Sequence, residues 1–261
     1  MFIFRLFIFR MFIFRMFIFR LFIFRKIKMA KTFMIHHNKH TNSNYYIGEV
    51  YSGGAFHVED TIYLLVSEES YKDPQERSRV IHTQGKTYNY IYQYSTKRIA
   101  LYKEQGKPNF IMGHRGTVPS DVKDLQSDLY ILANQFEKSQ RFKKAYEQTQ
   151  KVYDVYSDGV IPVTIAHTGH SLGAKVASRV ALRYESPAIT FNMGTSPLEI
   201  TQNIADRLKL KGDGDKYLRA LNMQTHYTTG FDPISMAANV MVGHEYVAPI
   251  SANVHSLANF Y

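Results

Sequence analysis

The feature that most constrains the fold of this chain is the hexapeptide at residues 168–173, Thr-Gly-His-Ser-Leu-Gly, which contains the pattern Gly-x-Ser-x-Gly. The segment before it, residues 162–168, is short and rich in β-branched residues, which predicts a buried strand. The segment after it, residues 174–184, predicts a helix with apolar residues on one face and basic residues on another. These are Ala174, Ala177, Ala181 and Tyr184 against Lys175, Arg179 and Arg183. A sharp turn between a strand and a helix needs small residues around its tip, so the context favours a nucleophile elbow that presents Ser171.

A nucleophilic serine needs chemical partners elsewhere in the chain. Its hydroxyl is a weak nucleophile at neutral pH, so it requires a histidine base, and the base requires a carboxylate that orients it. Asp232 follows a strand-like run at residues 217–223 and precedes a proline, which suits the carboxylate, although Asp-Pro pairs are also common in turns. His244 and His255 lie downstream, and from the residues alone either could be the base. The alternative interpretation of residues 168–173 is a glycine-rich turn of another α/β fold, such as a nucleotide-binding fold.

Four segments resemble, in the same order, the motifs of the class 3 lipase family, the fungal lipase-like branch of the α/β-hydrolases. Residues 109–117 resemble the strand that ends in Phe-Arg-Gly-Thr/Ser, and residues 124–129 resemble the Asp-Trp-x-x-Asp-Leu that follows it. Residues 168–173 match the family's Thr-Gly-His-Ser-Leu-Gly at every position, and residues 189–197 resemble its Thr-Phe-Gly-x-Pro strand. The resemblance covers about residues 85–261. It implies an α/β-hydrolase fold, with a mostly parallel central sheet and helices on both faces.

The resemblance also implies roles for individual residues of this chain. Ser171 is implied as the nucleophile, Asp232 as the carboxylate that orients the base, and His255 as the general base. The oxyanion hole is implied to come from the backbone of Thr117 and the N–H group of Leu172. These five residues form the expected active site, which holds no metal.

The chain departs from the family's motifs at several positions, none of which removes a catalytic group. They are His114, Leu125, Ala174, Lys175, Asn192 and Met193. His244 lies in a stretch that resembles a structural segment of the family, so His255 is the preferred base. Because the catalytic groups are retained, the departures leave the expected reaction type unchanged and weaken only the inference of the substrate class.

The expected activity is that of a serine acyl hydrolase, a lipase or esterase that cleaves carboxylic esters through an acyl-enzyme without a metal or organic cofactor. In the family a lid often follows the first oxyanion segment, and here that stretch, residues 118–125, is mostly polar. A polar lid favours a soluble ester or a monoacyl lipid over an oil-droplet surface. Two alternatives stay open: a catalytically idle hydrolase fold that binds a lipid or a protein partner, and a thioesterase or peptidase with the same triad.

The composition argues against a nucleic-acid-binding protein. The formal net charge is +10, but residues 1–28 contribute seven positive charges and no negative one, which leaves +3 for residues 29–261. That remainder is ordinary for an enzyme, and the sequence has no basic groove interleaved with aromatic residues. Residues 29–261 are enough for a single α/β domain with a sizeable core. Cysteine is absent, so the chain can form neither a disulfide nor a cysteine metal site.

Residues 1–28 begin with five near-identical pentapeptides of the form Met/Leu-Phe-Ile-Phe-Arg, and a period of five matches neither a helix nor a strand. As a membrane span the stretch is poor, because each inner arginine costs about 2.5–3.5 kcal/mol and each apolar residue gains only about 0.3–0.6 kcal/mol. It also lacks the uninterrupted apolar core and cleavage site of a signal peptide. We therefore expect a low-complexity segment outside the fold and a cytoplasmic location, with a peripheral membrane anchor as the alternative.

Local patterns predict the remaining elements. Strands are predicted at residues 45–51, 61–66, 87–94 and 98–103 and, after a hairpin turn at 104–108, up to Gly113; helices are predicted at 126–136, 141–156 and 198–210. The early strands are expected to extend one edge of the sheet. Four alternating tyrosines, Tyr88, Tyr90, Tyr92 and Tyr94, favour half-buried packing over a ligand platform. The histidines of the leader at residues 29–43 favour a flexible segment over a metal site.

Overall fold

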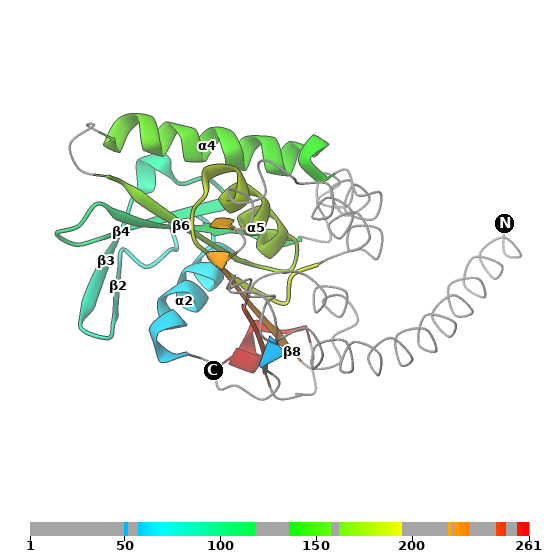
Figure 1. The fold of residues 1–261 in the computed structure, drawn as a ribbon. Helices are drawn as coiled ribbons and strands as arrows, with labels where there is room; N and C mark the ends of the chain where they lie inside the picture. Colours follow the sequence, from blue (N-terminus) through cyan, green and yellow to red (C-terminus); the bar gives the residue numbers. More distant parts are fainter. Residues whose placement is uncertain are drawn as a thin grey trace, which may run out of the picture. The chain divides into compact units, whose positions relative to one another are not determined.

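The computed structural model describes residues 50–51, 57–117, 136–157, 162–194, 219–220, 222–229, 244–248 and 255–260, with residues 50–51 and 244–248 described by their backbone alone. All of them belong to one compact unit, Ile47–Tyr261 (Figure 1). Several predicted features lie outside the described residues. These are the repeat at 1–28, the leader at 29–43, the lid segment at 118–125, the helix at 126–136 except for its last residue, the helix at 198–210, and Asp232.

The described strands form one sheet in the order β1-β9-β8-β7-β6-β5-β4-β3-β2. Their bounds are β1 (Val50–Tyr51), β2 (Val80–Thr83), β3 (Lys86–Tyr90), β4 (Ile99–Glu104), β5 (Asn109–His114), β6 (Thr164–His170), β7 (Ala188–Phe191), β8 (Gln224–Thr229) and β9 (His244–Ala248). The neighbours β1, β9, β8, β7, β6 and β5 are parallel to one another. The pairs β5–β4, β4–β3 and β3–β2 are antiparallel. The mostly parallel sheet is therefore confirmed. Of the predicted early strands, β3 and β4 extend one edge of the sheet, whereas β1 lies at the opposite edge beside β9, and β2 was not predicted.

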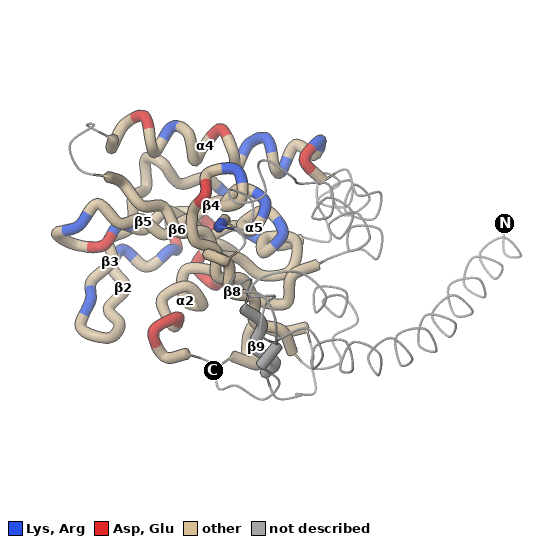
Figure 2. The backbone as a smooth tube through the Cα atoms, in the orientation of Figure 1, with Lys and Arg blue, Asp and Glu red and all other residues tan. Residues whose placement is uncertain are grey.

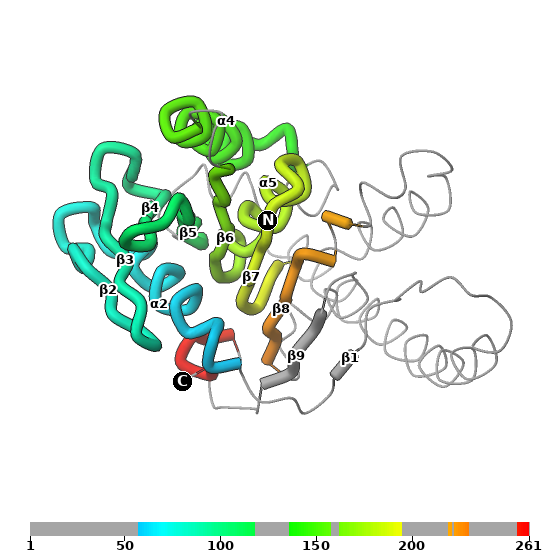
Figure 3. Tube along the Cα trace, turned by 60° about the vertical axis from the view of Figure 1, so that its left-hand side comes forward, coloured from blue at the N-terminus to red at the C-terminus, as the bar shows by residue number. Residues whose placement is uncertain are grey.

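Helices cover both faces of the sheet, which confirms the α/β class. The helices are α2 (Thr61–Glu69), α4 (Gln140–Tyr156) and α5 (Leu172–Tyr184), with the short 3-10 turns η1 (Val58–Asp60), η2 (Tyr92–Tyr94), η3 (Phe136–Lys138) and η5 (Leu257–Phe260). Figures 1 and 3 show α4 and α5 on one side of the sheet and α2 on the other. Among the described helices, none is both long and apolar enough to cross a membrane.

The alternation of side chains along the central strands builds a separate core on each face. In β4, Ile99 and Leu101 pack with the apolar residues of α4 and α5. Their neighbours Ala100 and Tyr102 point the other way and pack with Ile62 and Val66 of α2. The two cores hold the sheet between the helix layers and fix the ends of β5 and β6, where the candidate site lies.

The strand predicted at residues 61–66 is wrong, because this segment lies in helix α2. A short apolar run does not distinguish a buried strand from a buried helix by its periodicity. The chain enters the helix through η1, where the Thr61 hydroxyl donates a hydrogen bond to the Val58 carbonyl over 2.7 Å. Leu64 and Val66 are completely buried, so packing against the sheet outweighs the β propensity of the segment.

The tyrosine alternation follows a strand for only part of its predicted length. Tyr88 and Tyr90 lie on β3 and are buried in the α2 core, as predicted. Strand β3 ends at Tyr90, and the 3-10 turn η2 follows, where Tyr92 is half exposed. The predicted strand to residue 94 is therefore too long, because the turn brings the chain back toward β4.

The strand predicted at residues 217–223 is misplaced. Arg219, Ala220 and Asn222 are helical, and the strand β8 begins at Gln224. Arginine and alanine are strong helix formers, and this propensity outweighs the apparent alternation of the segment. The predicted hairpin turn at 104–108 and the predicted helix at 141–156 are confirmed by the β4–β5 pair and by α4.

Candidate active site

Ser171 occupies the sharp turn between β6 and α5 and has an unusual backbone conformation. Its φ is +57° and its ψ is −122°, a combination that L residues rarely adopt and that costs on the order of 1–3 kcal/mol. Hydrogen bonds on both sides hold this conformation. The Ser171 N–H donates to the Phe191 carbonyl over 3.1 Å, and the Ser171 carbonyl accepts from the N–H groups of Lys175 and Gly194 over 3.3 and 3.4 Å. A serine strained at the end of a strand and at the start of a helix has the geometry of a nucleophile elbow.

The glycines around Ser171 are required by close backbone contacts. A Cβ atom at Gly173 would lie 2.0 Å from the His114 carbonyl oxygen and 2.9 Å from the Gly116 nitrogen. A Cβ atom at Gly169 would lie 2.5 Å from the carbonyl carbon of Gly173. Only glycine therefore allows β6, α5 and the end of β5 to approach one another this closely.

The same approach brings the two predicted oxyanion segments together. Leu172 is the first residue of α5, so its N–H lies at the positive end of the helix. Thr117 follows Gly116 in the segment after β5, and the Gly116 backbone lies against the first turn of α5. The structure thus places the segment that precedes Thr117 against the start of α5, at the carboxyl ends of two neighbouring parallel strands.

His255 lies beside the elbow, although 84 positions separate it from Ser171 in the sequence. The His255 carbonyl oxygen lies 2.8 Å from the Nε2 atom of His170, and the two rings have centroids 4.8 Å apart. His170 immediately precedes Ser171, so the C-terminal segment is held next to the serine. The structure therefore places the preferred base next to the residue that precedes the predicted nucleophile.

The acceptor at His255 determines the proton position on His170. A carbonyl can only accept, so His170 Nε2 carries a proton. In the neutral ring Nδ1 is then an acceptor, and the Tyr71 hydroxyl, 3.0 Å away, donates to it. Tyr71 also reaches the oxyanion segment, because a Cβ atom at Gly116 would lie 2.0 Å from its hydroxyl oxygen. Nothing in the sequence pattern identifies Tyr71. It follows helix α2, whose apolar residues 61–66 predicted a strand instead.

The register of the sheet separates the two candidate bases. His170 is level with Phe191, Tyr227 and Tyr246, and His244 lies two residues before Tyr246 on β9. Three strand spacings of about 4.8 Å each put the backbone of Tyr246 about 14 Å from that of His170, and the two further residues along β9 put His244 about 16 Å away. This position disfavours His244 as the base. Asp232 lies outside the described residues, and its role as the orienting carboxylate stays a prediction.

Two further histidines form a buried pair under the elbow. His114 ends β5 and His167 lies on β6; both are at most 1% exposed, and His114 Nε2 lies 3.0 Å from His167 Nδ1. Burial lowers the pKa of His167 to about 3. Burial, followed by the positive charges of His167 and Arg141, holds the pKa of His114 well below its usual range. Both rings are therefore neutral and share one N–H between them, an arrangement that the sequence motifs did not predict.

Because both rings are neutral in the folded protein, we expect the free energy of unfolding to fall as the pH is lowered below about 6.5. The unfolded histidines take up protons near that pH, while the folded His167 does so only near pH 3. A lowered folded pKa therefore contributes stability that is complete above the unfolded pKa and is lost as the pH falls toward the folded one. We expect the free energy of unfolding to fall by about 1 kcal/mol per buried ring between pH 7 and 5.5.

Urea unfolding across this pH range measures the effect. The variant His167→Asn should flatten the slope, whereas His82→Asn, at an exposed histidine on β2, should leave it unchanged. An equal slope in wild type and His167→Asn would contradict the prediction.

Among the described residues, no group of three or more histidine, aspartate or glutamate side chains could hold a metal ion.

Lys175, predicted on the polar face of α5, is instead 1% exposed. The helix lies against the sheet on one side and beside α4, so its basic face is partly covered.

No protein-family model matches this chain, and no curated protein matches it in sequence. Among the solved structures that it resembles is carboxyl esterase 2 from the mycorrhizal fungus Tuber melanosporum, at 12% sequence identity and a TM-score of 0.34. The match covers 89% of this chain and 90% of that one. A likeness at this level carries no argument about chemistry. The resemblance to the class 3 lipases therefore depends on the sequence motifs alone.

Proposed function

We propose that this protein is a serine acyl hydrolase of the α/β-hydrolase type that cleaves carboxylic esters. The observation that carries the proposal is the strained positive φ of Ser171 between a parallel strand and a helix N-terminus. The contact between His170 and the His255 backbone supports it, because it keeps a histidine beside the serine. Strain of this kind persists where the surrounding structure holds it, and it is typical of functional sites.

In the proposed mechanism Ser171 Oγ attacks the ester carbonyl carbon while His255 takes its proton. The negative charge that develops on the carbonyl oxygen is received by the N–H groups of Leu172 and Thr117, and each such donor contributes about 10²–10³ in rate. The proton on His255 then passes to the departing alcohol, which leaves an acyl-enzyme. Water, deprotonated by the same histidine, releases the acid and restores the serine. Asp232 is proposed to orient His255 and to stabilise its cation.

The proposed substrate is a soluble ester or a monoacyl lipid ester, in keeping with the class 3 lipase-like motifs. The polar composition of residues 118–125 supports this choice over an emulsified triacylglycerol. A series of p-nitrophenyl esters of increasing acyl length should show a maximum at short or medium chains. A sharp rise in rate when the substrate passes its solubility limit would contradict the polar-lid argument. Turnover of thioesters or peptides in preference to these esters would favour the thioesterase or peptidase alternative.

Covalent labelling tests the proposed nucleophile. A fluorophosphonate should label the wild-type chain once, at the tryptic peptide that contains Ser171. Labelling should disappear in Ser171→Ala and persist in Ser157→Ala, at an exposed serine beyond α4. An unlabelled wild type would instead favour an idle hydrolase fold that binds a lipid or a protein.

Tyr71 is expected to act as a positioning residue in this site. Tyr71→Phe removes the hydroxyl that donates to His170 and leaves the ring in place, so His170 and the His255 backbone lose one constraint. We expect kcat to fall by about 3- to 10-fold, with little change in KM, because one neutral hydrogen bond contributes about 0.5–1.5 kcal/mol. The control is Tyr92→Phe, at a half-exposed tyrosine. A larger effect on KM than on kcat would show that Tyr71 binds substrate instead.

A further inference from the structure

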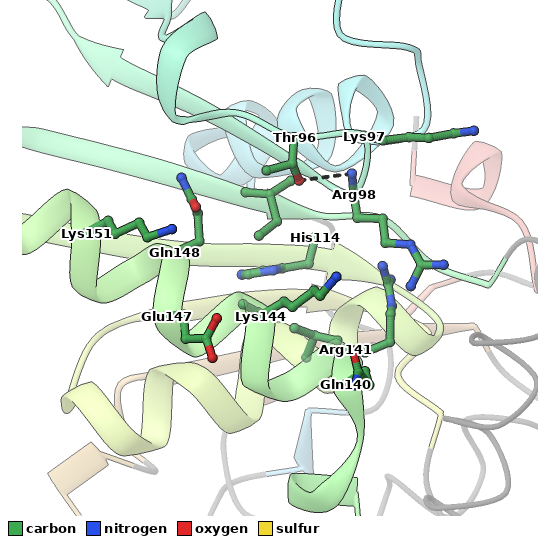
Figure 4. Close-up of a pocket in the computed structure, with 13 residues that line it drawn as sticks. Thr96, Lys97, Arg98, His114, Gln140, Arg141, Lys144, Glu147, Gln148 and Lys151 are labelled. Atoms are coloured by element: carbon green, nitrogen blue, oxygen red, sulfur yellow. Dashed lines mark hydrogen bonds between the residues drawn. The ribbon is translucent and has the colours of Figure 1, made fainter.

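A cleft of about 510 Å³ opens on the side of the sheet that α4 covers (Figure 4). It lies between the start of β4, the end of β5 and helix α4, and none of the five candidate catalytic residues lines it. Its volume is within the range of small-molecule sites, roughly 300–1,000 Å³. The cleft is therefore a candidate for a ligand other than the proposed ester.

The charge of the cleft is strongly positive. Its lining carries five cationic side chains against one carboxylate, that of Glu147. In Figure 4 the charged ends of Arg98, Arg141 and Lys144 extend toward one end of the cleft, whereas Glu147 and Lys151 lie toward the other. Figure 2 shows the basic residues of α4 along the same helix. Cations gathered in a concave site raise the local concentration of anions.

Two of the lining side chains are buried and held in place. Arg141 is 6% exposed and donates a hydrogen bond to the Arg115 carbonyl, so its charge does not swing freely in solvent. His114 is 1% exposed, and Figure 4 shows its ring among the side chains that line the cleft. Its Nε2 atom is engaged by His167, while its Nδ1 atom is buried without a hydrogen-bond partner among the described residues.

The orphaned nitrogen of His114 points to a ligand oxygen. When His167 donates to His114 Nε2, the proton of His114 lies on Nδ1, where it can be donated to an anion. Leaving a buried polar group unsatisfied costs about 1–3 kcal/mol, so an acceptor from a ligand would recover that energy. Three cations and one neutral donor in a single cleft suit a tetrahedral dianion better than a carboxylate.

We propose that this cleft binds the phosphate monoester group of an organic ligand, held by Arg98, Arg141 and Lys144 with a hydrogen bond from His114. The volume of the cleft exceeds the needs of a bare phosphate ion, so the group is part of a larger molecule. The same chemistry is presented by a soluble phosphorylated metabolite and by the headgroup of phosphatidic acid, whose phosphate is also a monoester.

Calorimetry with glycerol 3-phosphate tests the soluble source, using the full chain. We expect saturable binding that weakens as salt is added. Lys144→Gln should weaken it about tenfold, because one charged hydrogen bond is lost. Lys143→Gln is the matched control, at a neighbouring exposed lysine of α4 that does not line the cleft, and it should bind as wild type does.

Sedimentation with phosphatidylcholine vesicles, with and without phosphatidic acid, tests the lipid source. The basic repeat at residues 1–28 is present in all three proteins, so only the difference between Lys144→Gln and Lys143→Gln counts. Binding to glycerol 3-phosphate, or to phosphatidic acid vesicles alone, with a loss in Lys144→Gln only, supports the proposal and identifies the source. Absence of both interactions, or an equal loss in the two variants, overturns it.

Discussion

Replacing Ser171 by alanine is expected to lower kcat/KM for p-nitrophenyl esters by about 10⁴-fold or more. Alanine removes the hydroxyl that would form the acyl-enzyme, and the remaining oxyanion donors supply only the residual catalysis of binding and charge stabilisation. The reaction would be followed as release of p-nitrophenol by wild type and variant at matched concentrations.

The variant should fold at least as well as the wild type. Ser171 holds a positive φ, and alanine carries the same Cβ atom, so the backbone strain is unchanged. Circular dichroism and the midpoint of urea unfolding provide the control. A folded Ser171→Ala protein with wild-type turnover would exclude Ser171 as the nucleophile.

Replacing Gly173 by alanine is expected to lower the free energy of unfolding by about 3 kcal/mol or more. The new methyl group would lie 2.0 Å from the His114 carbonyl oxygen and 2.8 Å from the Arg115 carbonyl carbon, which are backbone atoms of the central sheet and of the segment that follows it. Alanine is better than glycine within a helix by only about 1 kcal/mol, so the clash outweighs the gain in propensity. Activity should fall with stability, because the clash displaces the segment that carries Thr117.

Gly85→Ala is the matched control for this prediction. Gly85 has a φ of +70° in the turn between β2 and β3, and a Cβ atom there would meet nothing within 4 Å. Its replacement should cost about 1 kcal/mol for the left-handed backbone alone. Equal losses in the two variants, measured by urea unfolding, would show that close packing at Gly173 does not govern stability.

The local motifs anticipated the elbow because its requirements are local. Glycines two positions before and after Ser171, a β-branched run upstream and an alanine-rich segment downstream are all within about twenty residues. These features act over a short range. The glycines are required where the backbones approach closely, and the alanine-rich segment has the periodicity of the helix that follows the turn. The same holds for the Glu104–Pro108 turn, where Gly106 has a φ of +77°.

Segments whose conformation depends on distant partners were predicted poorly. Residues 61–66 carry an apolar run that is compatible with either a strand or a helix, and burial of Leu64 and Val66 beneath the sheet decides for α2. The strand predicted at 217–223 failed for a related reason, since alternation in a short segment is a weak signal against helix propensity.

The sequence by itself determined the α/β class and the turn that presents Ser171, and its motifs favoured His255 over His244 as the base. Tertiary structure alone decided how the two histidines lie, because His255 contacts His170 of the elbow while the register of β9 puts His244 three strands away. It also created the Tyr71–His170 contact, the buried His114–His167 pair and the basic cleft. Local patterns record the preferences of neighbouring residues, whereas these contacts arise only when folding brings together strands and helices that are far apart in the chain.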